Sequence, residues 1–222
     1  QSDLVRVLTH EIMNSMTPVT SLARTASALM ERLDPADTAA IADARAAVDT
    51  LARRADGVMH FVESYRQISR APQIRRRSFP AAPFARELQR LFEADWPQDR
   101  IGFACTIVPD TLSIDADPDL LAQVLINLLR NAAEAALDHG PAPCVTLRIG
   151  ARRGPGVTIE VEDNGPGVPA DRMTEIFLPF FTTKARGNGI GLSFARQVVL
   201  AHDGEIGVAA GATGGALFRI LL

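Results

Sequence analysis

The chain has 222 residues, of which 47% are hydrophobic and 22% charged, and its formal net charge is −3. These values are ordinary for a globular protein and leave room for one large domain or two modest ones. They exclude the basic excess that nucleic-acid binding demands, and no apolar run approaches the roughly 20 residues of a membrane span. Cys105 and Cys144 lie far apart without metal-ligand spacing, so we expect both to be reduced core residues.

The first seventy residues carry a helical pattern of apolar side chains. These recur at steps of three and four over residues 3–33, and again from about Pro35 to Ser69. Asp34 suits an N-cap and Pro35 the first position of a helix, so a tight turn separates the two stretches. Two such helices form an antiparallel hairpin with one uncovered apolar face, which pairing into a four-helix bundle covers. We therefore predict a helical-hairpin domain over residues 1–70 that forms a homodimer.

His10 stands early in the first predicted helix, in polar company. The carboxylate of Glu11 can accept the proton of one ring nitrogen and leave the other free for attack. Asn14 follows His10 by one helical turn and shares its face, while Pro18 favours a bend just beyond. A kinked, partly exposed coiled-coil helix explains the same residues equally well, so this stretch alone leaves both interpretations open.

The pattern changes after residue 70. Proline ends the helical pattern, and residues 71–77 with their run of arginines indicate a solvated linker. From Ser78 onward the sequence predicts helices over 83–93, 117–138 and 190–201, and strands over 101–108, 111–114, 145–151, 157–162, 205–209 and 216–222. Asp117 is the expected cap of the long helix, with Pro118 at its start. Residues 78–222 thus indicate an α+β sandwich, a sheet covered on one face by helices.

Two stretches of this second domain carry side chains suited to ligand chemistry. Asn127 and Asn131 share one face of the long helix, and amide oxygens are suitable ligands for Mg²⁺ that is completed by substrate phosphates. An ordinary side-chain network is the simpler explanation of these two residues alone. Asp163 ends a strand, where its carboxylate can accept from an exocyclic amine such as that of adenine. Gly165 and Gly167 let the backbone approach a flat ligand.

A third stretch, from Phe180 to Leu192, combines small and basic residues and runs into a helix. Gly187, Gly189 and Gly191 allow tight curvature, and the helix N-terminus beyond them presents free amides to phosphates. Each stretch is a weak signal by itself, but three in this order within one domain are a strong one.

Taken in order, five motifs resemble the H, N, G1, F and G2 boxes of two-component sensor histidine kinases. They are His10-Glu11, Asn127 to Asn131, Asp163 to Gly167, Phe180-Phe181 and Gly187 to Gly191. The resemblance covers nearly the whole chain and is greatest to the NtrY and NtrB type. It implies a dimerisation and histidine-phosphotransfer hairpin followed by a Bergerat-type ATPase domain, in agreement with the architecture predicted above.

The resemblance also implies an activity, that of an ATP-dependent protein-histidine kinase using ATP and Mg²⁺. His10 would be the phosphoacceptor, Glu11 its base or orienting carboxylate, and Asn14 a residue for dephosphorylating the partner. Asn131 would bind the metal. The implied ATP-binding residues are Asn127, Asn131, Asp163, Gly165, Gly167, Phe181, Thr182, Thr183, Lys184, Gly187, Gly189, Gly191 and Leu192.

The chain departs from the family pattern at Glu134, where many members carry a lysine that faces the phosphates. Lys184 or Arg130 would then supply the positive charge. A degenerate kinase, which dimerises, binds ATP and docks a regulator without turnover, is the alternative. His202 and the other histidines away from His10 have no catalytic neighbours in sequence, so we expect surface or helix-end positions for them.

The expected partners are a second copy, paired through residues 1–70, and the receiver domain of a response regulator docking near His10, with no nucleic acid. Because the chain begins at Gln1 within a helical pattern, we expect it to be a fragment of a longer protein. We expect a cytoplasmic location, and membrane attachment only through an upstream segment.

Overall fold

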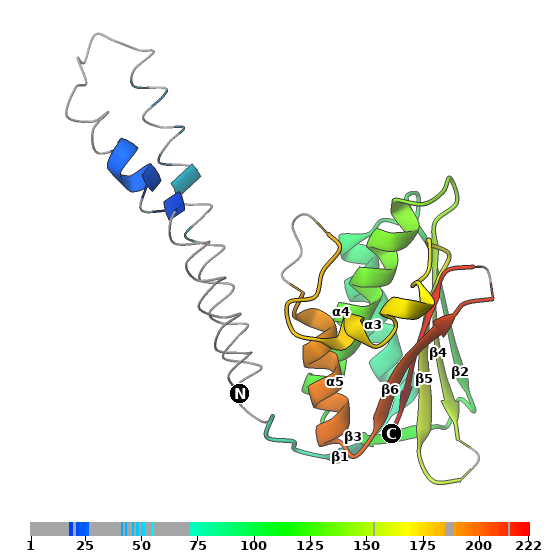
Figure 1. Cartoon of the computed structure of the whole chain (residues 1–222). Coiled ribbons are helices and arrows are strands. Elements are labelled where there is room, and N and C mark those ends of the chain that lie inside the picture. The colour runs from blue at the N-terminus through cyan, green and yellow to red at the C-terminus, as the bar shows by residue number, and fades with distance from the viewer. Residues whose placement is uncertain are drawn as a thin grey trace. The chain divides into compact units, whose positions relative to one another are not determined.

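The structure is a computed structural model of the whole chain (Figure 1). It describes residues 18–19, 21–26, 41, 43, 46, 48, 50–51, 55, 72–152, 154–184, 189–212 and 214–222. The chain divides into two units, Gln1–Arg66 and Gln67–Leu222, and each is described by itself. Every described residue of the first unit is helical, as predicted. The predicted turn at residues 33–37 lies outside the described residues.

The second unit is built on a five-stranded sheet with the strand order β2-β4-β5-β7-β6. Its strands are β2 (Gly102–Val108), β4 (Cys144–Ala151), β5 (Val157–Asp163), β6 (Glu205–Ala210) and β7 (Ala216–Leu221). All neighbours are antiparallel except β2 and β4, which are parallel. A separate two-stranded sheet pairs β1 (Arg77–Pro80) with β3 (Ser113–Ala116).

Three helices cover one face of the large sheet, and no described element covers the other (Figure 1). They are α3 (Ala81–Asp95), α4 (Pro118–Leu137) and α5 (Gly191–Ala201), and two short 3₁₀ helices, η1 (Ala170–Arg172) and η2 (Glu175–Phe177), precede α5. Strands β4 and β5 alternate between the covered and the open face. Leu147 and Ile159 are buried in the core, whereas Arg148 and Glu160 form an ion pair on the open face.

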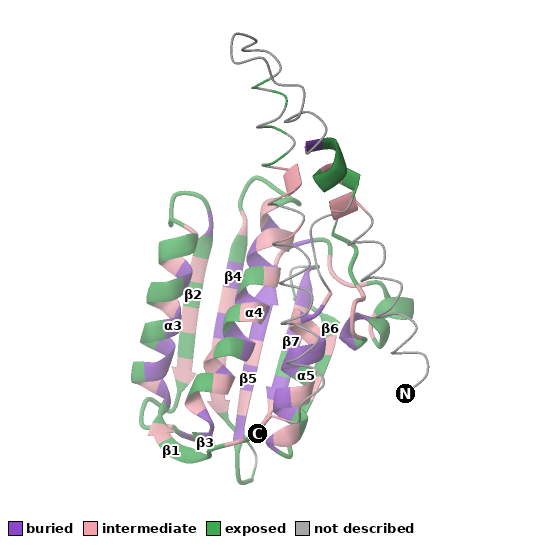
Figure 2. Ribbon diagram, turned by 90° about the vertical axis from the view of Figure 1, so that its left-hand side faces the viewer, coloured by how far each residue is buried: buried purple, intermediate pink, exposed green. Residues whose placement is uncertain are grey.

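Helix α4 is the central helix of the core (Figure 2). Among the described helices it alone has the length and mean hydropathy, 1.2, of a membrane span. Eight of its residues are buried in the domain, so here these properties belong to a core helix: Leu121, Val124, Leu125, Leu128, Leu129, Ala132, Ala133 and Ala136. Asp117 caps the helix by accepting from the backbone N–H groups of Asp119 and Leu120, at 3.1 and 3.2 Å, as the sequence predicted.

All the helices and strands predicted after Ser78 are present, with small shifts at their ends. The α+β sandwich is therefore confirmed. The short strand β1 was not predicted, and it begins at Arg77, inside the expected linker. The arginine run, which lies in the second unit, also contacts residues far from it in the sequence. The backbone N–H of Arg75 donates to Asp117 Oδ2 at 2.9 Å, and Arg76 forms an ion pair with Asp203 at 2.6 Å.

The cysteine prediction was wrong for Cys144, which is exposed at the start of β4, while Cys105 is partly buried against the core. A strand alternates between faces, and one face of this sheet is open, so a small apolar residue is not forced into the core.

His202 lies at the C-terminal end of α5, as expected, but it is buried. Its Nε2 accepts from the backbone N–H of Asp117 at 2.9 Å, so in the neutral ring Nδ1 carries the proton and donates to the carbonyl of Val198 at 2.8 Å. The imidazole thereby fastens the end of α5 to the start of α4.

Candidate functional site

Helix α4 presents a polar stripe in the middle of an apolar helix. Asn127, Asn131 and Glu134 follow one another by four and three residues, which places them along one side. All three are partly exposed, whereas Leu128 and Ala132 beside them are buried. Hydrophobic packing of α4 on the sheet therefore holds this stripe at the surface.

Asp163, the last residue of β5, is only 3% exposed. Its Oδ1 accepts from the backbone N–H groups of Gly165 and Ala216, at 2.8 and 3.2 Å. Burial raises the pKa of this carboxyl, and the two hydrogen bonds and the charge of Lys184 only partly oppose that effect. No group among the described residues donates to Oδ2, so one carboxylate oxygen remains available to a ligand.

The glycines after Asp163 permit close backbone packing. A Cβ on Gly165 would lie 2.8 Å from the carbonyl oxygen of Ala135 in α4, and one on Gly167, whose φ is 73°, would lie 2.9 Å from that of Gly214. These distances are too short for any side chain, so the loop is wedged between α4 and the turn before β7.

Asn164 fixes the same loop from the other side. Its side chain accepts from the backbone N–H of Cys144 at 2.9 Å and donates to the carbonyl of Ala142 at 2.8 Å. The backbone around Asp163 is thus tied to the start of β4 as well as to β7.

The segment that leads into α5 is closed at its base. The backbone N–H of Phe180 donates to the carbonyl of Gly189 at 2.9 Å. Both residues have positive φ, 67° and 64°, which is uncommon for phenylalanine. A Cβ on Gly189 would lie 2.4 Å from the carbonyl carbon of Phe180, so only glycine fits there. The start and end of this segment therefore lie side by side.

Lys184, in this segment, reaches the polar stripe of α4. Its ammonium group forms an ion pair with Glu134 and lies 3.5 Å from Oδ1 of Asn131. Thr182 Oγ1 accepts from the backbone N–H of Lys184 at 3.1 Å and shapes the local turn. The sequence led us to expect a positive charge from Lys184 or Arg130. In the structure, Lys184 is the one that lies against α4.

The first turn of α5 lies beside the other end of the stripe. The Cβ position of Gly191 is 3.6 Å from the side-chain amide of Asn127, and Ser193 Oγ donates to the carbonyl of Ile190 at 2.8 Å. The first N–H groups of a helix have no partner within the helix and favour anions. Leu192 and Phe181 pack on the core and anchor the two ends of the segment.

The structure thus brings Asn127, Asn131, Asp163, Lys184 and Gly191 around α4. Thr182 and Thr183, which directly precede Lys184, are exposed. His10, Glu11, Asn14 and Gly187 lie outside the described residues.

Two residues that the prediction did not include also belong to this region. Glu134 was noted only as a departure from a pattern, although its place three residues after Asn131 was a sufficient signal. A Cβ on Gly215 would lie 2.0 Å from the carbonyl oxygen of Asp163, and the glycines at 211, 214 and 215 were the signal for that contact.

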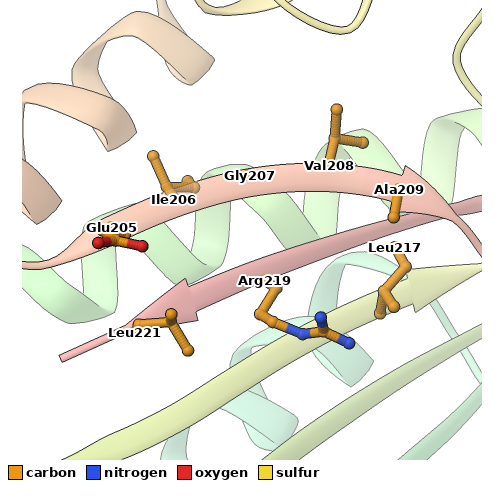
Figure 3. A pocket seen from close by; sticks show the side chains of 8 residues that line it. All are labelled: Glu205, Ile206, Gly207, Val208, Ala209, Leu217, Arg219 and Leu221. Carbon is orange, nitrogen blue, oxygen red and sulfur yellow. The ribbon is translucent and has the colours of Figure 1, made fainter. Parts of the chain in front are cut away.

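A pocket of about 220 Å³ lies elsewhere, on β6 and β7 (Figure 3). Its lining residues are Glu205, Ile206, Gly207, Val208, Ala209, Leu217, Arg219 and Leu221. Arg219 bonds to Glu160 of β5, which continues a ladder of charges across the open face of the sheet. None of the ligand-binding candidates lines this pocket, so we assign it no part in the site.

Comparisons with known proteins bear on the family and the fold of the second unit. Residues 116–222 match the family model of histidine kinase-, DNA gyrase B- and HSP90-like ATPases. The catalytic domain of histidine kinase ThkA is 31% identical, with a TM-score of 0.60 over 67% of this chain and 95% of that one.

The chain belongs to the sensor histidine kinase family. Sensor histidine kinase ZraS of Klebsiella oxytoca is 32% identical over 213 residues, which are 96% of this chain and 44% of ZraS. A crystal structure of ThkA with response regulator protein TrrA is 24% identical, with a TM-score of 0.74 over 99% of this chain and 60% of that one, and it shows the shared fold. The chain spans less than half the length of the curated relatives that it matches.

Proposed function

We propose that this chain is the catalytic core of a sensor histidine kinase that transfers the γ-phosphoryl group of Mg-ATP to His10 and then to an aspartate of a response regulator. The observation that supports this most is the convergence on α4. A buried carboxylate with one oxygen available, an amide paired with a lysine, and a helix N-terminus all meet along one helix. These are the groups that would recognise a purine amine, a metal-bound phosphate and an anionic chain.

The nucleotide would be oriented from both ends of the polar stripe on α4, which runs from Asn127 to Glu134. Asp163 would accept a hydrogen bond from the amino group of adenine through Oδ2, while Gly165 and Ala216 hold its Oδ1. Gly189, Gly191 and the first amides of α5 would face the phosphates, together with Lys184. Phosphoryl transfer depends mainly on positioning and on neutralising charge, and these residues supply both.

Magnesium fits the donor set on α4. Among the described residues there is no cluster of three or more His, Cys, Asp or Glu that could hold a metal ion. Mg²⁺ does not need one, because it commonly binds through one or two protein oxygens, waters and substrate phosphates. Asn131 would provide the protein oxygen, with Asn127 beside it, and the metal would neutralise phosphate charge.

His10 would attack the terminal phosphorus with the ring nitrogen left unprotonated, while Glu11 holds the proton on the other nitrogen. The bond from that phosphorus to the oxygen it shares with the β-phosphate would break, and ADP would leave. The phosphorylated imidazole would then be the donor to the receiver domain of the regulator. We propose a homodimer through residues 1–70 in the cytoplasm as the setting for both transfers.

Incubation with γ-labelled ATP and Mg²⁺ tests the kinase proposal. We expect acid-labile, alkali-stable label in the parent and none in His10→Gln, because only a phosphohistidine has that stability and that site. ATP binding by a parent that takes up no label would instead support the degenerate, regulator-docking alternative.

We also propose that Asn14 supports dephosphorylation of the regulator by placing a water near the phosphoryl group. Asn14→Ala should abolish regulator dephosphorylation and leave labelling of His10 intact, measured with the phosphorylated receiver domain. Loss of both activities together would count against this role.

A further inference from the structure

Glu134 and Lys184 lie in different parts of the chain and form an ion pair. Glu134 lies on α4, Lys184 lies 50 residues later in the segment before α5, and their side chains are 36% and 43% exposed. The same ammonium group is 3.5 Å from Oδ1 of Asn131, one helical turn before Glu134. A carboxylate and an amide therefore share one lysine at the position proposed for the phosphates.

This arrangement places two acceptors in competition for one cation. Phosphate oxygens bound near Asn131 would need Lys184 for charge-assisted hydrogen bonds, and the carboxylate of Glu134 already holds it. An exposed ion pair of this kind is weak, so a ligand with several negative charges can replace it. Its replacement nevertheless reduces the affinity that the ligand would otherwise have.

We propose that Glu134 is a positioning residue that acts through Lys184: it holds the ammonium group beside Asn131 until the phosphates of Mg-ATP take that group over. The inference rests on the proposed function and adds to it a residue that sets nucleotide affinity. Glu134 weakens ATP binding by competing for Lys184, and it has no direct contact with the nucleotide.

The test is equilibrium binding of Mg-ATP and of adenosine to the whole 222-residue chain, by calorimetry. Glu134→Gln keeps the shape of the side chain and removes its charge. It should tighten Mg-ATP binding about two- to fivefold, the range expected for releasing an exposed pair. Adenosine has no phosphates, so its affinity should stay the same.

Two further variants isolate the lysine. Lys184→Gln should weaken Mg-ATP binding, and adding Glu134→Gln to it should bring no further gain, because no ammonium remains to be released. Asp203→Asn is the charge-matched control, since it removes one carboxylate from the exposed pair with Arg76 and should leave ATP affinity unchanged.

Labelling kinetics supply a second readout. In Glu134→Gln the KM for ATP should fall by the same factor and kcat should stay constant, as expected when only uniform binding changes. A purely structural role for the pair would instead lower the thermal stability of the variant and leave KM unchanged, which would contradict the proposal.

Four other outcomes would overturn the inference. Weaker ATP binding in Glu134→Gln would make Glu134 a ligand of the metal. If Glu134→Gln raised ATP affinity equally with and without Lys184, Glu134 would act only by repelling the charge of the phosphates. A parent that binds no ATP would remove the proposed function and this inference together, whereas a parent that binds ATP with no response to Glu134→Gln would remove this inference alone.

Discussion

Two aspartates of the second unit are buried to a similar degree and are used in opposite ways. Asp117 is 7% exposed and Asp163 is 3% exposed. Both oxygens of Asp117 are occupied: Oδ1 accepts from Asp119 and Leu120, and Oδ2 accepts from Arg75. Asp163 uses only Oδ1 within the described structure.

The pKa values follow from this difference. Burial acts to raise the pKa of Asp117, but three backbone N–H groups and His202 outweigh it, and the pKa is lowered. Burial raises the pKa of Asp163, and its two hydrogen bonds do not compensate. A fully bonded buried carboxylate therefore stabilises the fold, whereas a half-bonded one is held at some expense of stability and is ready for a ligand.

The largest expected effect comes from breaking the support of Asp163. In Gly215→Ala the new Cβ would meet the carbonyl oxygen of Asp163 at 2.0 Å, so the backbone must shift. We expect a loss of about 3 kcal/mol in the free energy of unfolding, at the upper end for overpacking, together with weaker ATP binding. Urea denaturation and calorimetry measure the two effects.

Gly207→Ala is the matched control, because the structure leaves nothing within 4 Å of its Cβ position in β6. Its stability should stay within about 0.5 kcal/mol of the parent. Equal losses in the two variants would show that alanine itself, and not the contact with Asp163, is responsible.

A smaller change separates binding from folding at the same place. Asp163→Asn keeps an acceptor for Gly165 and Ala216 but removes the charged oxygen proposed for the adenine amine. We expect ATP affinity to fall about 10- to 100-fold, the range for losing a hydrogen bond to a charged group, with a folded protein by circular dichroism. Unchanged affinity would remove Asp163 from the proposed site.

Most helices and strands of the second unit could be predicted from the sequence because local patterns mark them. Asp117 and Pro118 mark the start of α4, and apolar alternation marks β4 and β5. Strand β1 was missed because it is four residues long and is defined by pairing with β3, which is a non-local contact.

The site was predicted as a set of motifs, and the structure adds the contacts between them. The spacing of the glycines predicted the loop after Asp163. No local pattern could predict that Gly215, 52 residues later, packs directly against Asp163. In the same way, the pairing of Glu134 with Lys184 depends on the packing of α5 and the preceding segment on α4. Chain segments far apart in sequence decide these two features.

The smallest expected effect, and the one that tests the comparison most directly, is the pH dependence of stability. A carboxyl whose native pKa is lowered binds fewer protons in the folded state than in the unfolded state. Its stabilisation is complete above the unfolded pKa and is lost as the pH falls through the folded pKa. Asparagine is an equally good cap. Asp117→Asn should thus melt below the parent at neutral pH, and the difference should shrink on acidification.

For Asp163 we expect a difference in melting temperature of the opposite sign. Its raised native pKa means that the folded state binds more protons, so ionisation destabilises the fold as the pH rises from the unfolded pKa through the folded one. Asp163→Asn removes that cost and should melt above the parent at neutral pH, by a margin that vanishes toward about pH 4, near the ordinary aspartate pKa. Thermal unfolding of the parent and both variants across this range measures the two differences. If Asp163→Asn also melted below the parent, hydrogen bonding and not burial would dominate at both carboxylates, and Asp163 would be no less fully satisfied than Asp117.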